Sequence, residues 1–288
     1  MSRVICAGHV NWDVTLHVDR LPSADGEAKI TDQRQGGGGS ASNVAAVLAQ
    51  FDLDTTLFGS VGDDEHGMLV EYELDELGVD TDLVVVPDEQ TTVKYLIVDA
   101  DGEVMVLGNE GANEGLRPDD LNEPKVRRAD HLHLTSQHPA TAERLAEVAV
   151  ESGVSVSFAP GRRLADRDYG RIADQSDLLF LNEKEATAYC EDPATIARET
   201  GRTLVVTHGS GGAQAYTPEG TFHHAGFDVD PVDTTGAGDA FAAGYLAARL
   251  DGDVEAALAA ANACGAIAAQ TMGARTEVDW AALDAYLG

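Results

Sequence analysis

The stretch DTTGAGDAF, residues 233–241, combines a carboxylate with the start of an expected helix. Residues 237–250 are mostly helix formers, so the segment Gly236 to Gly238 would lie at a helix N-terminus. Backbone N–H groups there lack intrahelical acceptors and the helix dipole is positive, which favours an anion. Asp239, in the first turn, could cap the helix, or it could accept the proton of a hydroxyl group during phosphoryl transfer.

A glycine run and a polar pair nearer the N-terminus could hold a sugar. The run GGGGSASN, residues 36–43, precedes a second expected helix that Ser42 is placed to cap. Four glycines cost conformational entropy unless something approaches the backbone closely, and no Lys or Arg follows as in a P-loop. The run favours a neutral polyol lying against the backbone, with a flexible loop as the alternative. In GHVNWD, Asn11 and Asp13 lie on one side of a strand end and could hold adjacent sugar hydroxyls, or form a turn.

Two further motifs follow expected strands, at the edge where α/β proteins bind ligands. In NEKE, residues 182–185, Glu185 could organise Mg²⁺ through water, or it could belong to a solvated helix start. In VVTHGSGGA, the small residues Thr207, Gly209 and Gly212 could line a nucleotide phosphate.

The histidines and cysteines form no recognisable metal or disulfide pattern. His131 and His133 alternate along a strand-like run, but no carboxylate or cysteine stands beside them at ligand spacing. The three cysteines are far apart and odd in number, which suits a reducing compartment. No apolar run approaches the ~20 residues that span a bilayer, and MSRVICAGHV lacks a signal-peptide pattern. We therefore expect a cytoplasmic protein.

The charge balance excludes some partners. The chain has 50 acidic and 19 basic residues, a formal net charge of −31, which would repel nucleic acid and anionic membranes. The acidic residues are scattered rather than gathered in one block, which favours a solvated surface adapted to high salt over a polycation-binding function.

Alternating strands and helices predict the fold class. Short apolar runs with strand character begin at Val4, Thr56, Val154, Leu178 and Thr203. Helical periodicity separates several of them, as in TAERLAEVAVESG, which ends on a plausible C-cap at Gly153. This alternation predicts parallel βαβ units, and so a single α/β domain over residues 1–288.

Two segments without helical signal interrupt that alternation. They comprise residues 14–35 and 88–113, and the second contains the turn dipeptide Asp101-Gly102. Their alternation of apolar and polar residues suits strands covered on one face. We interpret them as a small β-sheet that forms a lid, the alternative being an extension of the main sheet. Such a lid has free edges and an apolar face that a second subunit would cover, which predicts a homodimer through the lids.

In this order, the motifs resemble those of the ribokinase family, also called the PfkB carbohydrate kinases. The resemblance extends from GHVNWD to MGA at residues 272–274; DTTGAGDAF matches the C-terminal signature closely and GGSASN the N-terminal one more loosely. It implies a doubly wound α/β fold with a β lid, and ATP-dependent phosphorylation of a sugar or sugar-containing molecule, with Mg²⁺ as cofactor and K⁺ as a further candidate.

The resemblance also implies roles for matching residues. Asp239 would be the general base and Gly236, Ala237 and Gly238 the anion hole. The sugar site would be lined by Asn11, Asp13, Gly38, Gly39 and Asn43. The nucleotide and Mg²⁺ would involve Asn182, Glu185, Thr207, Gly209 and Gly212, with Asn262 near the adenine. A monovalent cation would lie at Asp233, Thr235 and Gly273.

Some positions depart from the ribokinase pattern and leave the substrate open. Ser40 replaces the usual Lys of the glycine motif, Glu277 stands where Ser is usual in the loop after Gly273, and Ala159 replaces a strand-end aspartate. The N-terminal segment resembles archaeal nucleoside kinases equally well. Ribose is favoured, while a nucleoside, 2-keto-3-deoxygluconate, a fructose-type sugar and a phosphosugar remain alternatives. A sugar-binding regulator without activity is a further alternative, although the intact Asp239 and glycines argue against it.

A phosphosugar would require a cationic clamp for its phosphate. The candidates are Arg34, Lys94, Arg162 and Arg163.

Overall fold

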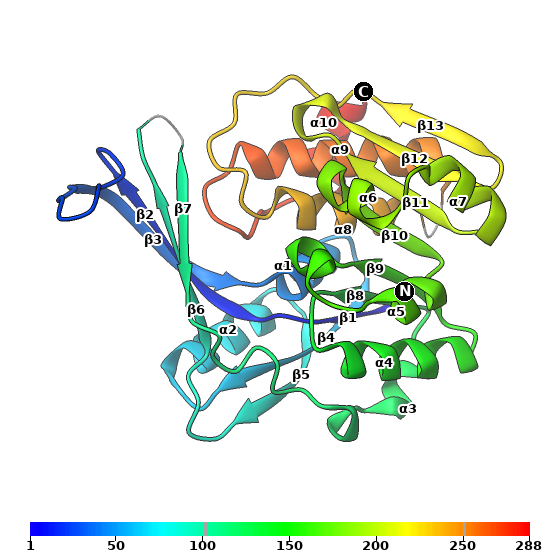
Figure 1. Ribbon diagram of the computed structural model, residues 1–288, viewed down its shortest axis with the longest axis horizontal. Coiled ribbons are helices and arrows are strands. Elements are labelled where there is room, and N and C mark those ends of the chain that lie inside the picture. The colour runs from blue at the N-terminus through cyan, green and yellow to red at the C-terminus, as the bar shows by residue number, and fades with distance from the viewer. Residues whose placement is uncertain (101–102, 250–251) are drawn as a thin grey trace.

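The computed structural model describes residues 1–100, 103–249 and 252–288. These residues form a large sheet covered by helices on both faces, and a smaller sheet that stands away from it (Figure 1). Two expectations fall outside the described residues. They are the turn at Asp101-Gly102 and Leu250, the last residue of the helix expected over 237–250.

The large sheet has the expected doubly wound, mostly parallel topology. Its nine strands within the described residues are ordered β13-β12-β11-β10-β9-β8-β1-β4-β5. The chain winds from β1 to one edge through β4 and β5, and then from β8 to the other edge. Only β12 and β13 run antiparallel to their neighbours. The strands are β1 (Arg3–Ala7), β4 (Asp54–Gly62), β5 (Asp80–Val86), β8 (His131–Thr135), β9 (Ser155–Ala159), β10 (Leu178–Asn182), β11 (Thr203–Thr207), β12 (Ala213–Thr217) and β13 (Gly220–His224).

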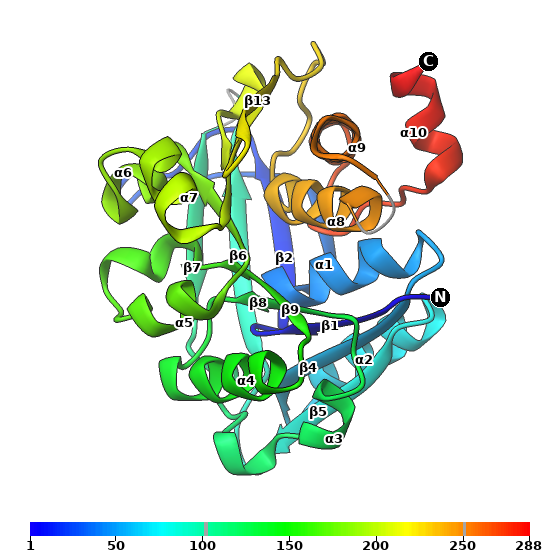
Figure 2. The same ribbon diagram turned by 90° about the vertical axis from the view of Figure 1, so that its right-hand side faces the viewer.

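Helices cover both faces of this sheet (Figure 2). One face carries α1 (Ser40–Ala49), α2 (Glu65–Glu76), α8 (Ala237–Arg249), α9 (Val254–Ala269) and α10 (Trp280–Leu287). The other carries α3 (Glu123–Val126), α4 (Pro139–Glu151), α5 (Gly170–Gln175), α6 (Glu183–Tyr189) and α7 (Pro193–Thr200). Short 3₁₀ turns span Pro118–Asp120, Gly161–Ala165 and Gly209–Gly211.

Strand periodicity explains the two hydrophobic cores. Successive side chains of a strand point to opposite faces. In β1, Val4 and Cys6 therefore join the core under α1 and α8, whereas Ile5 and Ala7 join the core under α4 and α5. Gly153 has φ 72° just after α4, as a C-terminal glycine should.

The smaller sheet, which we call the lid, has four strands in the order β3-β2-β6-β7. They are β2 (Asn11–Val18), β3 (Ile30–Gly38), β6 (Thr92–Val98) and β7 (Val104–Gly108). The lid is a separate sheet, so the two inserted segments do not extend the main sheet.

The first lid hairpin is wider than the segment 14–35 that the sequence indicated. Strand β3 continues through the glycine run, and its backbone pairs with the start of β2, Gly38 opposite Asn11 and Gly36 opposite Asp13. Part of the run is therefore a β-strand rather than a flexible loop, because hydrogen bonds to β2 hold its backbone.

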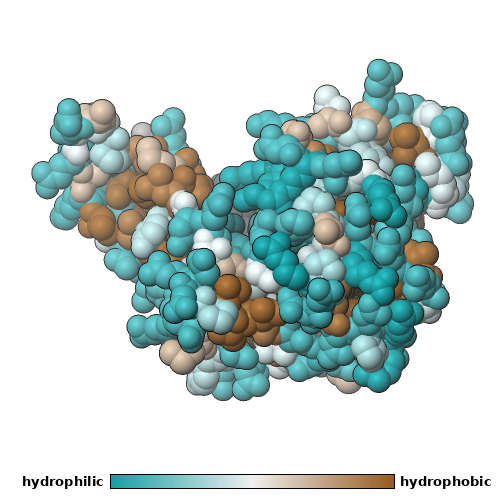
Figure 3. Space-filling model, turned by 60° about the horizontal axis from the view of Figure 1, so that its bottom comes forward, coloured by the Kyte–Doolittle hydropathy of each residue, from teal (hydrophilic) through white to brown (hydrophobic). Residues whose placement is uncertain are grey.

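Apolar side chains gather on the part of the lid that projects from the body, where Figure 3 shows a hydrophobic area. Exposed residues there are Tyr95, Val104, Met105, Val106 and Leu107. None of the helices within the described residues is long and apolar enough to cross a membrane.

Two buried histidines lie between β8 and β9, bonded to serines. The ring of His131 contacts Ser155 Oγ and Ser157 Oγ, both at 2.7 Å, and His133 Nδ1 contacts Ser157 Oγ at 2.8 Å. Burial lowers the pKa of His131 to about 4 and that of His133 to about 3. Both are therefore neutral in the folded protein at neutral pH, and their partners are hydroxyl groups.

This burial predicts acid sensitivity. In the unfolded chain each histidine takes up a proton as the pH falls through about 6.5, whereas the folded protein does not. The free energy of unfolding should therefore decrease between about pH 6.5 and 4, by at most about 1.4 kcal/mol per pH unit for each histidine. In urea unfolding at several pH values, the free energy of unfolding should change less with pH for His133→Asn than for the wild type. An equal pH dependence would contradict the lowered pKa of His133.

Candidate active site

Asp239 lies in the first turn of α8 and is joined to α1 by a hydrogen bond. Asn43 Nδ2 donates to Asp239 Oδ2 at 2.8 Å. Burial raises the pKa of Asp239 to about 6, while hydrogen bonds from Asn43 and Ser40 and the charge of Lys94 oppose that rise. The carboxylate can therefore be ionised at neutral pH and still be basic enough to accept a proton.

The backbone before Asp239 takes the shape expected of a helix N-terminus. Gly236 has φ 76°, and a Cβ there would come within 2.3 Å of the carbonyl oxygen of Ala274. A Cβ at Gly238 would meet nothing within 4 Å, so this position opens onto free space. Ala237 N–H already donates to the Thr234 carbonyl at 3.3 Å. Gly236 and Gly238 are thus better placed than Ala237 to offer backbone N–H groups to an anion.

Asn11 and Asp13 lie on one face of β2, as the sequence indicated, but on the lid rather than at the end of a main-sheet strand. A Cβ at Gly38 would come within 2.1 Å of Asp13 Oδ2, so the glycine leaves room for this carboxylate. Burial raises the pKa of Asp13 to about 6, against the opposing charges of Lys94 and Arg275. Two carboxylates with raised pKa values, Asp13 and Asp239, thus interact near the same lysine.

Arg275, which sequence analysis did not single out, fills the space beside the next glycine. A Cβ at Gly37 would come within 2.2 Å of its guanidinium. Arg275 Nη1 donates to Glu73 Oε2 at 2.6 Å and Nη2 to Ser42 Oγ at 2.7 Å, and Glu73 Oε2 also accepts the Gly37 N–H at 2.8 Å. The prediction that Ser42 caps α1 is wrong, because the helix begins at Ser40 and Ser42 is already within it.

The residue that caps α1 is Gly39, with φ 96°. A Cβ there would come within 2.4 Å of the carbonyl oxygen of His9. The glycine run thus admits three of the chain's own groups, namely Asp13, Arg275 and the His9 backbone. Only glycine permits these approaches together with this φ.

Asn113 is a second polar residue that the sequence did not reveal. Its Nδ2 donates to Asn11 Oδ1 at 2.6 Å, and its Oδ1 accepts the Val10 N–H at 3.0 Å. It lies 102 residues from Asn11 in a segment without secondary structure, so no local pattern marks it. Asn11 is fully buried, and its Nδ2 has no hydrogen-bond partner among the described residues.

The expected nucleotide residues lie at the carboxyl ends of neighbouring strands. Asn182 of β10 and Thr207 of β11 are register partners. Asn182 and Glu185 form a capping box at the start of α6: Asn182 Oδ1 accepts the Glu185 N–H at 2.9 Å, and Glu185 Oε2 accepts the Asn182 N–H at 3.0 Å. Glu185 therefore has a structural role in the helix start, which engages one of its two carboxylate oxygens.

The two glycines after β11 differ in what surrounds them. Gly209 has φ 57° and nothing within 4 Å of a Cβ position, so it faces open space. A Cβ at Gly212 would come within 2.0 Å of the His224 carbonyl oxygen, so close packing against β13 accounts for this glycine. Asn262 is buried in α9 and donates to the Leu258 carbonyl at 2.7 Å.

The three residues expected around a monovalent cation do come together. Asp233 Oδ1 accepts the Thr235 N–H at 2.8 Å, and Asp233 Oδ2 accepts the Gly273 N–H at 3.0 Å. Asp233 thereby connects the loop before α8 to the loop after α9.

The four candidate cations for a phosphate clamp separate into two groups. Arg34 is exposed and lies 3.7 Å from Asp32, and Arg162 is exposed. Lys94 interacts electrostatically with His9, Asp13 and Asp239, and Arg163 with His9. The fold therefore brings Lys94 to Asp13, and Arg163 to His9 and Glu114.

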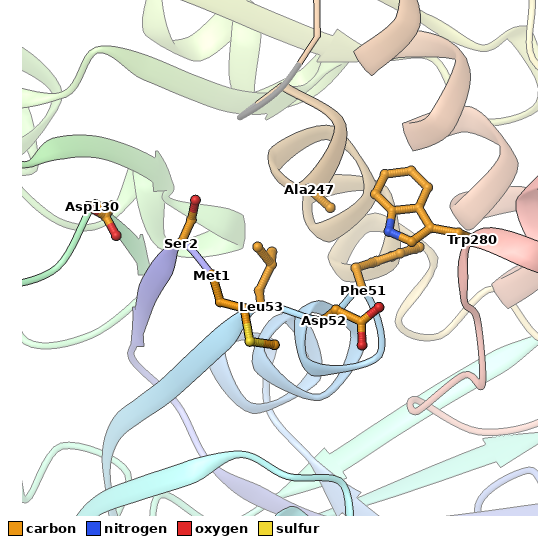
Figure 4. Close-up of a pocket in the computed structure, with 8 residues that line it drawn as sticks. All are labelled: Met1, Ser2, Phe51, Asp52, Leu53, Asp130, Ala247 and Trp280. Atoms are coloured by element: carbon orange, nitrogen blue, oxygen red, sulfur yellow. The ribbon is translucent and has the colours of Figure 1, made fainter.

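A hollow of about 490 Å³ lies elsewhere, at the amino ends of the strands. Figure 4 shows its lining, which includes Ser2, Leu53, Asp130 and Trp280. It does not include Asp239. Across the described ranges, no three His, Cys, Asp or Glu side chains are grouped as a metal site would require.

The chain is similar to known sugar and nucleoside kinases over its full length. An "ATP-dependent ribose-1-phosphate kinase" from Halopiger xanaduensis is 56% identical, with 100% of this chain and 98% of the relative covered. A "Nucleoside kinase" from Methanothermobacter thermautotrophicus is 28% identical, with 96% and 92% covered.

Solved structures agree with this relationship. The nucleoside kinase of Methanocaldococcus jannaschii superimposes with a TM-score of 0.86 at 23% identity, covering 100% of this chain and 98% of that one. The Arabidopsis thaliana ribokinase, solved with ribose and ATP, gives 0.85 at 25% identity, covering 99% and 98%. The family profile described as "pfkB family carbohydrate kinase" matches residues 1–281. This chain therefore belongs to the pfkB family of carbohydrate kinases, enzymes that transfer a phosphoryl group to a sugar-type substrate.

Proposed function

We propose that this chain transfers the γ-phosphoryl group of ATP to a hydroxyl of ribose 1-phosphate. The substrate follows from the relative at 56% identity, which is named for that activity and matches the whole chain. The nucleoside kinases share the fold but are more distant in sequence. A phosphorylated sugar also suits a site that has Lys94 and Arg163 close to its polar residues.

The single observation that carries the proposal is the position of Asp239. Its carboxylate accepts a hydrogen bond from Asn43 and lies in the first turn of α8, directly after Gly238, which faces open space. A base and an anion site in this arrangement serve phosphoryl transfer to a hydroxyl group, because one accepts the proton while the other holds negative charge.

In the proposed reaction, the hydroxyl oxygen of the sugar bonds to the γ-phosphorus of ATP, and Asp239 accepts the proton of that hydroxyl. The bond between that phosphorus and the bridging oxygen breaks, and ADP leaves with the electron pair. The N–H groups of Gly236 and Gly238 hold the transferred group, with Ala237 between them. Asn11, Asp13 and the backbone of Gly38 and Gly39 hold the sugar, and Asn43 keeps Asp239 in place.

The donor would lie along the carboxyl ends of β10 and β11. There Asn182, Thr207 and Gly209 line the phosphates, with Gly212 shaping the turn and Asn262 on the adenine side. Mg²⁺ on ATP supplies positive charge to the phosphates. The Asn182–Glu185 pair fits that ion, because the capping box uses only Glu185 Oε2 and a carboxylate has two oxygens. A K⁺ ion would be held by the loops that Asp233 joins, near Thr235 and Gly273.

We place this reaction in a cytoplasm of high salt. The cysteines Cys6, Cys190 and Cys264 are all free, which suits a reducing compartment. The net charge of −31 is tolerated best where salt screens its repulsion.

The first prediction from this proposal concerns the base. In high KCl with Mg·ATP, ADP release should occur with ribose 1-phosphate and be slower with ribose, nucleosides, 2-keto-3-deoxygluconate and hexoses. Asp239→Asn keeps the shape of the side chain but cannot accept a proton, so kcat should fall about 10²- to 10⁴-fold.

Asp54→Asn, an exposed residue at the start of β4, is the matched control and should retain full kcat. Turnover of Asp239→Asn close to that of the control would exclude Asp239 as the base. Preferential turnover of a nucleoside would replace the proposed substrate while leaving the base intact.

The second prediction concerns pH. Asp239 acts as a base only when ionised, and both its pKa and that of Asp13 are raised to about 6. The kcat/KM for the sugar substrate should therefore fall as the pH drops below about 6. Asp13→Asn removes a like charge that raises the pKa of Asp239, so the acidic limb should move to lower pH in this variant. A wild-type profile that stays flat down to pH 5 would contradict this assignment.

The third prediction concerns assembly. We propose that two chains pair through their lids, because Tyr95, Met105, Val106 and Leu107 expose apolar surface and β3 and β7 are free sheet edges. Light scattering should give twice the chain mass of 30.3 kDa. Leu107→Asp should shift the equilibrium toward monomer, whereas Val150→Asp, an exposed apolar position on α4, should not. A wild-type protein that stays monomeric at micromolar concentration would rule the dimer out.

A further inference from the structure

Beside the expected sugar residues, three charged or titratable side chains meet around one carboxylate. Glu114 Oε1 lies 2.6 Å from Arg167 Nη2, 3.8 Å from Arg163 Nη1 and 3.5 Å from His9 Nε2. The contacts with His9 and Arg167 lower the pKa of Glu114 to about 2. Burial, the largest cause, lowers the pKa of His9, so this ring is mostly neutral at neutral pH.

The chain connects this group directly to the sugar residues. Glu114 follows Asn113, whose side chain bonds Asn11 Oδ1, and His9 precedes Val10, whose N–H bonds Asn113. Lys94, opposite Asp13 in the lid, interacts electrostatically with His9. The group is therefore adjacent to Asn11 and Asp13.

The two arginines differ in how firmly they are held. Arg167 is 17% exposed, pairs with Glu114, and donates from Nη1 to the Gln137 carbonyl at 2.8 Å; that carbonyl also accepts the Tyr169 hydroxyl at 2.8 Å. Arg163 lies in the 3₁₀ turn after β9, is 44% exposed, and is only loosely paired at 3.8 Å. Arg167 is thus fixed, while Arg163 can reorient toward a ligand at little cost.

The charges here differ in sign from those of the rest of the molecule. Around Glu114, Arg163 and Arg167 carry two positive charges against one negative charge, a local excess of one in a chain of net charge −31. Lys94 adds a positive charge that Asp13 and Asp239 offset. Two guanidinium groups beside one carboxylate favour the anionic oxygens of a phosphate monoester. Among the described residues, the buried Nδ2 of Asn11 also has no hydrogen-bond partner.

We propose that Arg163 and Arg167, supported by Glu114 and joined by Lys94 and His9, bind the phosphate that the sugar substrate already carries. This inference rests on the proposed function and adds the residues that select a sugar phosphate over a free sugar. Arg167 supplies a fixed positive charge and the N–H groups that Glu114 and the Gln137 carbonyl leave free, and Arg163 leaves its loose contact with Glu114 to complete the site. Glu114 is a positioning residue, since it acts through the arginines.

Steady-state kinetics of the full-length enzyme with ribose 1-phosphate and Mg·ATP test this site. Arg163→Ala should raise the KM for ribose 1-phosphate about 10- to 100-fold, the effect of one charge-assisted contact. Its kcat at saturating sugar and its KM for Mg·ATP should stay within twofold of the wild type. Arg167→Lys, which keeps the charge but loses the fork, should raise the same KM. The control is Arg171→Ala, which removes an equal charge from a side chain that is 69% exposed on α5 and pairs with Glu143 and Glu147.

The outcomes separate this inference from the proposed function. If wild-type enzyme does not act on ribose 1-phosphate but acts on another acceptor, the proposed substrate is wrong and the phosphate site falls with it. If wild-type enzyme acts on ribose 1-phosphate and Arg163→Ala behaves as Arg171→Ala does, only the phosphate site is wrong. If Arg163→Ala raises the KM for Mg·ATP and lowers kcat as much as it raises the KM for the sugar, the residue has a structural role. That result would also overturn the phosphate site.

Discussion

The hydrogen bond from Asn43 to Asp239 connects the two helices on which the candidate site depends. Asn43 belongs to α1 and Asp239 to α8, and the residues are 196 positions apart in the chain. Removing a carboxylate from water is costly unless hydrogen bonds or opposite charge compensate, and here Asn43, Ser40 and Lys94 do so only in part. The result is a carboxylate that is held in one orientation and remains basic. Both properties are needed for a group that accepts a proton from a bound hydroxyl.

The glycine run explains how the lid is attached to this site. Gly37 leaves room for Arg275, Gly38 for Asp13, and Gly39 for the backbone of His9. Arg275 connects the loop after α9 to α2 through Glu73 and to α1 through Ser42. These contacts hold the base of the lid against both helices and this loop. A side chain at any of these glycines would push one of those groups away. The composition of the run indicated that some group must lie close to its backbone. Groups of the protein itself therefore occupy at least part of that space.

Basic residues gather around the acidic residues of the candidate site. The chain carries a net charge of −31, yet Lys94, Arg163, Arg167 and Arg275 all lie near Asp13, Glu114 or Glu73. Basic residues are few in this sequence, so their concentration here is an arrangement made by the fold. An anionic substrate would meet repulsion over most of the surface, whereas Arg163 and Arg167 beside Glu114 would offer it positively charged partners.

Local sequence pattern was enough to predict the fold class, the separate lid and the helix that begins at Ala237. These features depend on periodicity and on helix-start signals, which act over a few neighbouring residues. The same reasoning placed Asn11 and Asp13 on one face, and the family resemblance brought Asp233 and Gly273 into one proposed site. The prediction that Ser42 caps α1 was wrong, because this residue lies inside the helix. The predicted boundary of the first lid hairpin was also wrong, because part of the glycine run belongs to strand β3. The same reasoning also missed Asn113, Glu114, Arg167 and Arg275. Their contacts join residues that are from 30 to 233 positions apart, and no short-range signal carries such a pairing. Which charges meet, and therefore which carboxylates stay basic, follows from how the sheet, the lid and the loops pack together.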